Sequence, residues 1–125
     1  MSAETQALST REKGISGEDR AAAYLLKNGY SIVERNFRIR EGEIDIIAEK
    51  GDLLVFAEVK ALPHGNAEIL AHELGIRKQQ KIIKTAKCYL EKYRQYKCRA
   101  IRFDVLAIDV PGLEPVHHIE NAFSE

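Results

Sequence analysis

Two charged residues stand directly after an apolar run, where charged side chains are uncommon. Glu58 and Lys60 follow the five apolar residues 53–57. Alternate residues of a strand share a face, so both charges point to one side of the expected strand. Because unpaired charges at such a position are costly, we interpret Glu58 and Lys60 as parts of a polar site.

Two further carboxylates can reach the same place. Asp45 precedes Glu58 by thirteen residues, and a turn near residue 51 places it opposite residue 57 or 58 of the neighbouring strand. Its side chain approaches Glu58 if the register puts both on one face. Glu18 lies on the apolar stripe of an expected helix that faces the same sheet. Three carboxylates and the Lys60 ammonium group would then converge.

Converging carboxylates repel one another unless a cation or a proton lies between them. Oxygen ligands favour a hard divalent ion, Mg²⁺ or Mn²⁺, over zinc. Such an ion lowers the pKa of a bound water and neutralises charge on a phosphate. A nearby ammonium group stabilises the developing negative charge or orients the attacking water. Together these groups are suited to metal-assisted hydrolysis of a phosphodiester.

Basic residues are concentrated in one part of a chain whose overall charge is balanced. Nineteen basic residues offset nineteen acidic ones, but residues 77–102 hold ten bases and a single acid. That segment therefore carries a charge of +9, and the rest of the chain carries −9. Such asymmetry can produce a positive face that binds a polyanion. The alternative is an ordinary solvated helix face.

Apolar periodicity and turn residues predict the elements that must position these side chains. The expected helices cover residues 15–28, 67–74 and 76–93, and the expected strands cover 30–39, 43–48, 53–62, 100–110 and 116–119. Ser16 is the expected N-cap of the first helix, and Gly29 is its C-terminal glycine. The long helix between the third and fourth strands predicts a parallel crossover.

Length and composition fit one domain over residues 1–125. We expect the N-terminus, residues 1–12, to be flexible, and residues 63–75 to form a mobile loop. No apolar run approaches the roughly 20 residues of a membrane span, and the first ten residues lack the pattern of a secretory signal. Cys88 and Cys98 form no common zinc pattern with the histidines. We therefore expect a cytoplasmic protein with reduced cysteines.

The acidic motifs resemble those of the PD-(D/E)XK nuclease superfamily. The matching stretches are Gly42-Glu43-Ile44-Asp45 and Glu58-Val59-Lys60, preceded by Glu18 on a helix. The resemblance implies an α/β fold with a restriction-endonuclease-like αβββαβ core, in which a mixed sheet is flanked by helices. Over about residues 14–110, the chain is more narrowly similar to the bacterial YraN-like family of uncharacterised proteins, which itself resembles archaeal Holliday junction resolvases.

The resemblance assigns roles to the acidic residues and the lysine. It implies that Asp45, Glu58 and the backbone carbonyl of Val59 hold Mg²⁺ or Mn²⁺, and that Lys60 is the catalytic lysine. Glu18 would act on the metal directly or through a water. The implied activity is an endonuclease that leaves 5′-phosphate ends, with branched DNA as a candidate substrate. Because junction-cutting relatives are dimers, a homodimer is a candidate assembly.

The resemblance also marks Gln79 as a candidate catalytic residue, because it matches a polar position early in the expected helix 76–93 and lies within that helix's apolar stripe. The chain departs from the family after the motif lysine. Ala61 and Leu62 stand where the family usually has a hydroxyl residue and then a basic one. We expect a nucleic-acid partner, DNA rather than RNA. The candidate contacts are Arg38, Arg40, Arg77, Lys78, Lys81 and Lys84.

Simpler interpretations of the same residues remain open. Glu58 and Lys60 can form an ordinary cross-strand charge network, and Asp45 can merely pair with Lys60. Glu18 can be a helix-terminal acid that interacts with the positive end of the helix dipole. For the whole protein, one alternative is a non-cutting accessory protein that binds nucleic acid. Another is a protein-interaction module that uses the basic helix 77–94.

Overall fold

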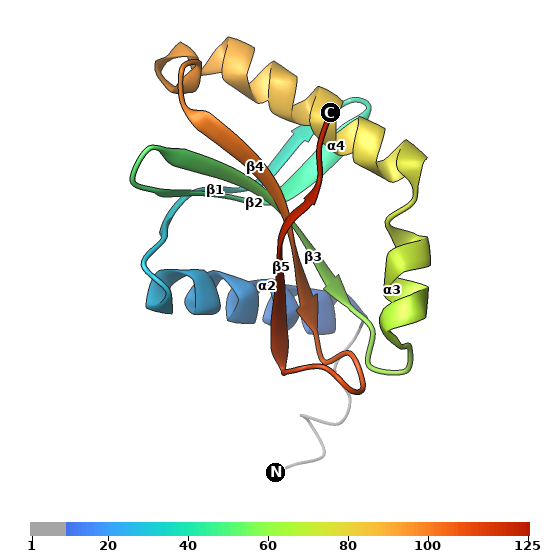
Figure 1. The fold of residues 1–125 in the computed structure, drawn as a ribbon. Coiled ribbons are helices and arrows are strands. Elements are labelled where there is room, and N and C mark those ends of the chain that lie inside the picture. The colour runs from blue at the N-terminus through green and yellow to red at the C-terminus, as the bar shows by residue number, and fades with distance from the viewer. Residues whose placement is uncertain (1–9) are drawn as a thin grey trace.

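The structure, a computed structural model, describes residues 10–125. It is a mixed α/β fold in which a five-stranded sheet, ordered β1-β2-β3-β4-β5, has helix α2 on one face and α3 and α4 on the other (Figure 1). The helices are α2 (Thr10–Lys27), α3 (Ala67–Glu73) and α4 (Ile76–Lys92), and the strands are β1 (Ser31–Ile39), β2 (Gly42–Lys50), β3 (Leu53–Ala61), β4 (Ala100–Ile108) and β5 (Val116–Phe123). No helix within residues 10–125 is long and apolar enough to cross a membrane.

Most predicted elements are confirmed, including the parallel crossover, since β3 and β4 are parallel while the other neighbouring strands are antiparallel. The first helix differs, because it begins at Thr10 and Ser16 therefore lies inside it. β5 is longer than the predicted 116–119. Of the expected flexible N-terminus, residues 1–9 lie outside the described residues and residues 10–12 belong to α2. Residues 63–75 contain α3, whose N-cap Asn66 accepts a hydrogen bond from the N–H of Ile69.

The sheet separates two apolar layers. Against α4, the buried helix residues Ile82, Ala86 and Tyr89 pack on strand residues that include Phe56. Tyr89 is 2 % exposed and its ring lies edge-on to that of Phe56, so it belongs to the core and is not available to stack on a nucleobase. Against α2, helix residues including Leu25 pack on the other side of the same strands. Apolar burial of this kind is what fixes each helix to its face of the sheet.

The usual alternation of strand faces is interrupted near one end of the β1–β2 pair. Arg35 pairs with Ile46, and two residues further Phe37 pairs with Ile44. Residues two apart should share a face, yet Ile46 packs in the α2 layer and Ile44 in the α4 layer. Between these pairs lies Asn36, whose φ of 56° is rare for a non-glycine residue. This kink turns the end of the two strands toward α4.

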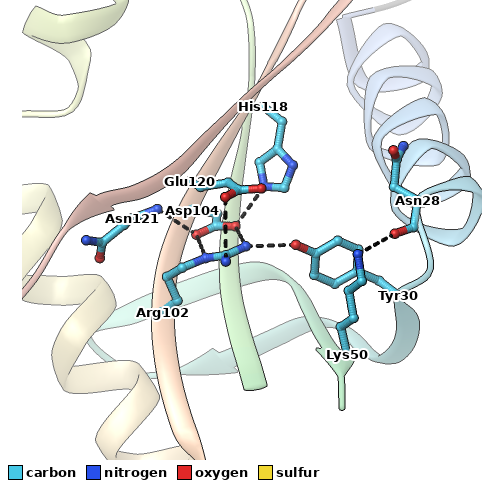
Figure 2. Close-up of polar contacts among 8 residues, drawn as sticks. All are labelled: Asn28, Tyr30, Lys50, Arg102, Asp104, His118, Glu120 and Asn121. Atoms are coloured by element: carbon cyan, nitrogen blue, oxygen red, sulfur yellow. Dashed lines mark hydrogen bonds and ion pairs between the residues drawn. The ribbon is translucent and has the colours of Figure 1, made fainter. Parts of the chain in front are cut away.

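A buried charge network joins β4 to β5 and to the start of β1 (Figure 2). Asp104, which is 0 % exposed, accepts hydrogen bonds from Arg102 at 2.7 and 2.8 Å, and from the N–H of Asn121 at 2.9 Å. His118 Nε2 lies 2.7 Å from the same carboxylate, and Arg102 also donates to the Tyr30 hydroxyl. Burial opposes ionisation of Asp104, but these hydrogen bonds outweigh it and lower its pKa to about 2.

Candidate active site

The predicted pair of carboxylates lies on two neighbouring antiparallel strands. Ile46 pairs with Ala57, and continuing the ladder by one residue places Asp45 across from Glu58, within the predicted range. The backbone N–H of Val59 donates a hydrogen bond of 2.8 Å to Asp45 Oδ2. Both carboxylates line one cleft of about 160 Å³. We call it the acidic cleft; its lining residues are Gly42, Glu43, Asp45, Glu58, Lys78, Lys81 and Ile82.

The width of the acidic cleft depends on a close approach between β2 and α4. A Cβ atom on Gly42 would lie 2.5 Å from Thr85 Oγ1 and 3.2 Å from the carbonyl oxygen of Lys81. Thr85 is itself fully buried, with its hydroxyl bonded to that same carbonyl at 2.7 Å. Glycine is therefore the residue that lets the strand lie this near to the helix. The Gly42-Glu43-Ile44-Asp45 motif thus includes a packing requirement as well as an acid.

Burial and charge repulsion strongly perturb the ionisation of Asp45. Glu58 is only 8 % exposed. Burial, and after it the negative charge of Glu58, raise the pKa of Asp45 from 3.8 to about 7, with smaller contributions from Glu43 and Glu18. The hydrogen bond from the N–H of Val59 opposes this change. A carboxyl that resists ionisation beside a second carboxylate is what a site built for a cation is expected to show.

Asp45 and Glu58 form the acid pair of the acidic cleft, and the ammonium group beside this pair belongs to a lysine of α4. Lys78 Nζ lies 2.8 Å from Glu58 Oε2, and the Lys78 side chain is 39 % exposed. Burial tends to lower the pKa of Lys78, but the hydrogen bond and charge of Glu58 outweigh burial and raise it. Sequence reasoning placed Lys78 among the nucleic-acid contacts and missed this position. The available signal was its spacing, four residues before the buried Ile82.

The motif lysine of β3 has a different partner. Lys60 Nζ lies 2.7 Å from Glu73 Oε1 at the end of α3, and the two side chains are 25 % and 42 % exposed. Lys60 is not among the residues that line the acidic cleft. Glu58 and Lys60 therefore stand two residues apart on one strand, as predicted, but each is paired with a separate helix. Neither the Glu58–Lys60 pair nor the Asp45–Lys60 pair is formed.

Glu18 and Gln79 are each held outside the acidic cleft. Glu18 Oε1 accepts hydrogen bonds from Arg35 at 2.9 and 3.0 Å and from the Asn36 side chain at 2.9 Å. Its charge still contributes to the raised pKa of Asp45. Gln79 donates a hydrogen bond of 2.7 Å to the carbonyl of Leu74, and it lines a separate cleft on the other side of α4.

Several of the predicted nucleic-acid contacts border the acidic cleft. Lys81 is exposed and lines it, whereas Arg77 is exposed at the start of α4. Lys84, on the same helix, forms a long ion pair of 3.7 Å with Glu41. Arg38 is paired at 2.9 Å with the cleft residue Glu43, and Arg40 is exposed at the end of the same β1–β2 hairpin. Basic side chains thus border the acidic cleft on its helix side and at this hairpin.

The donor set of the acidic cleft fits a hard divalent ion. Its carboxylates supply only oxygen ligands, the type that Mg²⁺ and Mn²⁺ prefer. The repulsion that raises the pKa of Asp45 is the interaction a cation would relieve. Among residues 17–125, whose side chains the structure describes, no three of His, Cys, Asp or Glu are gathered as a complete ligand set. Asp45 and Glu58 would therefore need water, substrate or backbone oxygens to complete a metal site.

A mixed five-stranded sheet with helices on both faces, in the order α2, β1–β3, α4, β4, corresponds to the restriction-endonuclease-like core. The chain belongs to the uncharacterised protein family UPF0102, which matches residues 17–108. The expected YraN-like membership is thereby confirmed.

Relatives from several organisms match most of the chain. A UPF0102 protein of Persephonella marina is 44 % identical over 111 residues, covering 89 % of this chain and 92 % of the relative. One from Geobacter metallireducens is 43 % identical over 117 residues, covering 93 % and 95 %. A UPF0102 protein of Treponema pallidum is 45 % identical over 95 residues, covering 76 % and 75 %. The similarity therefore extends over nearly the whole length of two of these three relatives.

Proposed function

We propose that this chain is a Mg²⁺- or Mn²⁺-dependent nuclease that hydrolyses phosphodiester bonds in DNA. The observation that carries the proposal is the acid pair Asp45 and Glu58, which lines one cleft beside a basic helix. The raised pKa of Asp45 supports a cation-binding role, because the pair is unfavourable without a neutralising charge. The resemblance to junction resolvases is the reason that we propose branched DNA as a candidate substrate and a homodimer as a candidate assembly.

In this proposal, Asp45 and Glu58 hold the ion, aided by the carbonyl of Val59. When bound, a divalent ion supplies Lewis-acid chemistry and lowers the pKa of water. Lys60 faces the scissile phosphate after release from Glu73. Ion pairs of this partly exposed kind contribute only about 0–1 kcal/mol, so a phosphate can compete with Glu73 for the ammonium group. Glu18, held by Arg35 and Asn36, adds negative charge near the acid pair.

The substrate backbone would lie along the basic side of α4. Arg77, Lys81 and Lys84 project from its first three turns, and Lys81 borders the acidic cleft directly. Cations at this spacing contact successive phosphates and release counterions, so DNA binding should weaken steeply as salt rises. This arrangement puts the polyanion contacts next to the acid pair, as a nuclease requires. Arg38 and Arg40 would contact the backbone on the hairpin side.

The test is cleavage of end-labelled linear, flapped and four-way DNA with Mg²⁺, Mn²⁺ or EDTA. We compare the wild type with Glu58→Gln and Asp45→Asn, which keep the size of each side chain and remove its charge. Glu68→Gln, at an exposed position on α3, is the matched control. Cutting that needs metal and falls at least about 100-fold in both cleft variants supports the nuclease.

The same experiment separates the alternatives. Salt-sensitive DNA binding without cutting, equal in the wild type and in both cleft variants, contradicts the nuclease and favours a non-cutting accessory protein. A protein that neither cuts nor binds any of the three DNAs contradicts both, and the interaction module based on the basic helix then becomes the leading interpretation.

A further inference from the structure

Lys78 lies on the face of α4 that is turned toward the sheet. The residues four, seven and eleven positions later, Ile82, Thr85 and Tyr89, are all buried. A charged side chain on such a stripe is costly unless it has a partner. Lys78 meets this requirement through Glu58, at 2.8 Å. Its position is therefore set by an acid in the sheet, unlike the positions of the exposed lysines on the solvent side of the helix.

The pairing pattern distinguishes the two lysines near the acid pair. Within the described residues, the ion pair of Glu58 is with Lys78, and that of Lys60 is with Glu73. Lys78 lines the acidic cleft together with both carboxylates. Glu58 has a side chain only 9 % exposed, so water can do little to stabilise its charge. The Lys78 ammonium group is the cation that makes the ionised cleft tolerable in the protein alone.

We propose that Lys78 is the internal counter-ion of the acid pair, and that it leaves Glu58 when a divalent ion enters the acidic cleft. The proposal deepens the nuclease function and rests on it. An ammonium group and a divalent cation repel each other strongly at contact distance in a half-buried site, so holding both on Glu58 is unfavourable. Lysine has a flexible four-carbon stem, and this side chain is 39 % exposed, which leaves its ammonium group a route toward the cleft mouth.

The released ammonium group would then be available to a DNA phosphate at the cleft mouth, beside Lys81. Lys78 is thus a positioning residue with two alternating partners, Glu58 in the metal-free protein and the substrate backbone in the loaded one. This exchange predicts an unusual pair of effects. Removing the charge of Lys78 should make metal binding easier, because no ion pair is broken, and should make DNA cleavage slower.

The test measures Mn²⁺ affinity by isothermal titration calorimetry without DNA, at fixed ionic strength. Lys78→Met keeps the apolar stem and removes the charge. We expect it to bind Mn²⁺ about fivefold more tightly than the wild type, which corresponds to about 1 kcal/mol. Lys78→Arg keeps a cation beside Glu58 and should bind Mn²⁺ within about twofold of the wild type. DNA cleavage by Lys78→Met should be at least about tenfold slower.

Two lysines provide matched controls. Lys60→Met removes a cation whose partner is Glu73, and Lys84→Met removes one that lies outside the acidic cleft. Both should leave Mn²⁺ affinity within about twofold of the wild type. Circular dichroism establishes that each variant is folded, and Lys78→Gln, which retains a polar end for Glu58, replaces Lys78→Met if the latter does not fold.

The outcomes separate this proposal from the nuclease function. The counter-ion proposal is overturned if Lys78→Met binds Mn²⁺ no more tightly than the wild type. It is also overturned if Lys84→Met strengthens Mn²⁺ binding as much as Lys78→Met does. The absence of Mn²⁺ binding in every protein tested overturns it as well. If the wild type cuts DNA in any of these cases, the nuclease stands without the counter-ion. If Lys78→Met binds Mn²⁺ more tightly and no protein cuts DNA, the counter-ion stands and the nuclease fails.

Discussion

Replacing Glu58 with glutamine should lower the pKa of Asp45. That pKa is raised from 3.8 to about 7, first by burial and then by the charge of Glu58, with Glu43 and Glu18 adding less. Glutamine preserves the shape of the cleft, so only the contribution of the Glu58 charge is lost. We expect a decrease of at least about one pKa unit, equivalent to about 1.4 kcal/mol. The pKa should stay above 3.8, because Asp45 remains buried.

The same pKa determines how stability depends on pH. A carboxyl whose pKa is raised on folding holds its proton more tightly in the folded state, so the stability that it contributes is complete below about pH 4 and is lost as the pH rises through about 7. The full difference corresponds to about 4 kcal/mol. Divalent metal binds the ionised form, so the stabilisation produced by Mg²⁺ should be larger at pH 8 than at pH 5.

Carboxyl carbon NMR from pH 3 to pH 9 measures the Asp45 pKa in the metal-free wild type, in Glu58→Gln and in the control Glu68→Gln. Urea unfolding at pH 5 and pH 8 measures the loss of stability, which should shrink in Asp45→Asn. The reasoning is refuted if Asp45 titrates near 3.8 in the wild type, or if its pKa is the same with Gln at position 58. Either result would mean that the two carboxyls do not share a buried cleft.

Three further predictions concern the residues that support the site and the fold. Asp104→Asn should lower the free energy of unfolding in urea by about 3–5 kcal/mol, because it leaves buried partners uncompensated. The folded pKa of Asp104 is about 2, so its stabilising contribution is present above about pH 4 and is lost as the pH falls toward 2. The wild type and the variant should therefore differ in stability above this pH window and not below it. Gly42→Ala should lower the free energy of unfolding by about 1–3 kcal/mol in the same urea assay, because the new Cβ would lie 2.5 Å from Thr85 Oγ1. A stability equal to that of the wild type would contradict the close approach of β2 to α4. Asn36→Gly should be more stable than Asn36→Ala by about 1 kcal/mol in thermal unfolding, because only glycine adopts a φ of 56° without strain, and equal stability would remove the argument for strain.

Sequence reasoning succeeded where local periodicity determines the outcome. A hairpin with a short turn allows few registers, so the position of Asp45 opposite residue 57 or 58 followed from counting residues. The apolar stripe of α4 and the parallel crossover followed from the 3.6-residue period and the length of the connection. Each of these features depends on neighbouring residues in the chain, which the sequence contains explicitly.

The partners of long charged side chains were not predictable in the same way. Strand alternation gives the face on which Lys60 lies, but its stem is long enough to reach several acids, and it pairs with Glu73 of α3. Lys78 was predicted only as a nucleic-acid contact, since a basic segment with one acid gives no sign of which lysine pairs with an acid of the sheet. The start of α2 was misplaced because Ser16 is a good N-cap in isolation and the helix continues through it.

The hydrogen bonds of Asp104 have a consequence for the sheet edge that β5 forms. Most residues of this strand are only partly buried, so apolar contacts alone distinguish weakly between alternative pairings with β4. Moving β5 along β4 by one residue would turn each side chain to the opposite face, carrying the His118 ring away from Asp104. The fully buried Asp104 carboxylate would then lose a hydrogen-bond donor. It would lose the same donor if a foreign strand paired with β4 in place of β5. The Asp104 network therefore favours one alignment of β5 on β4 and disfavours replacement of β5 by a foreign strand.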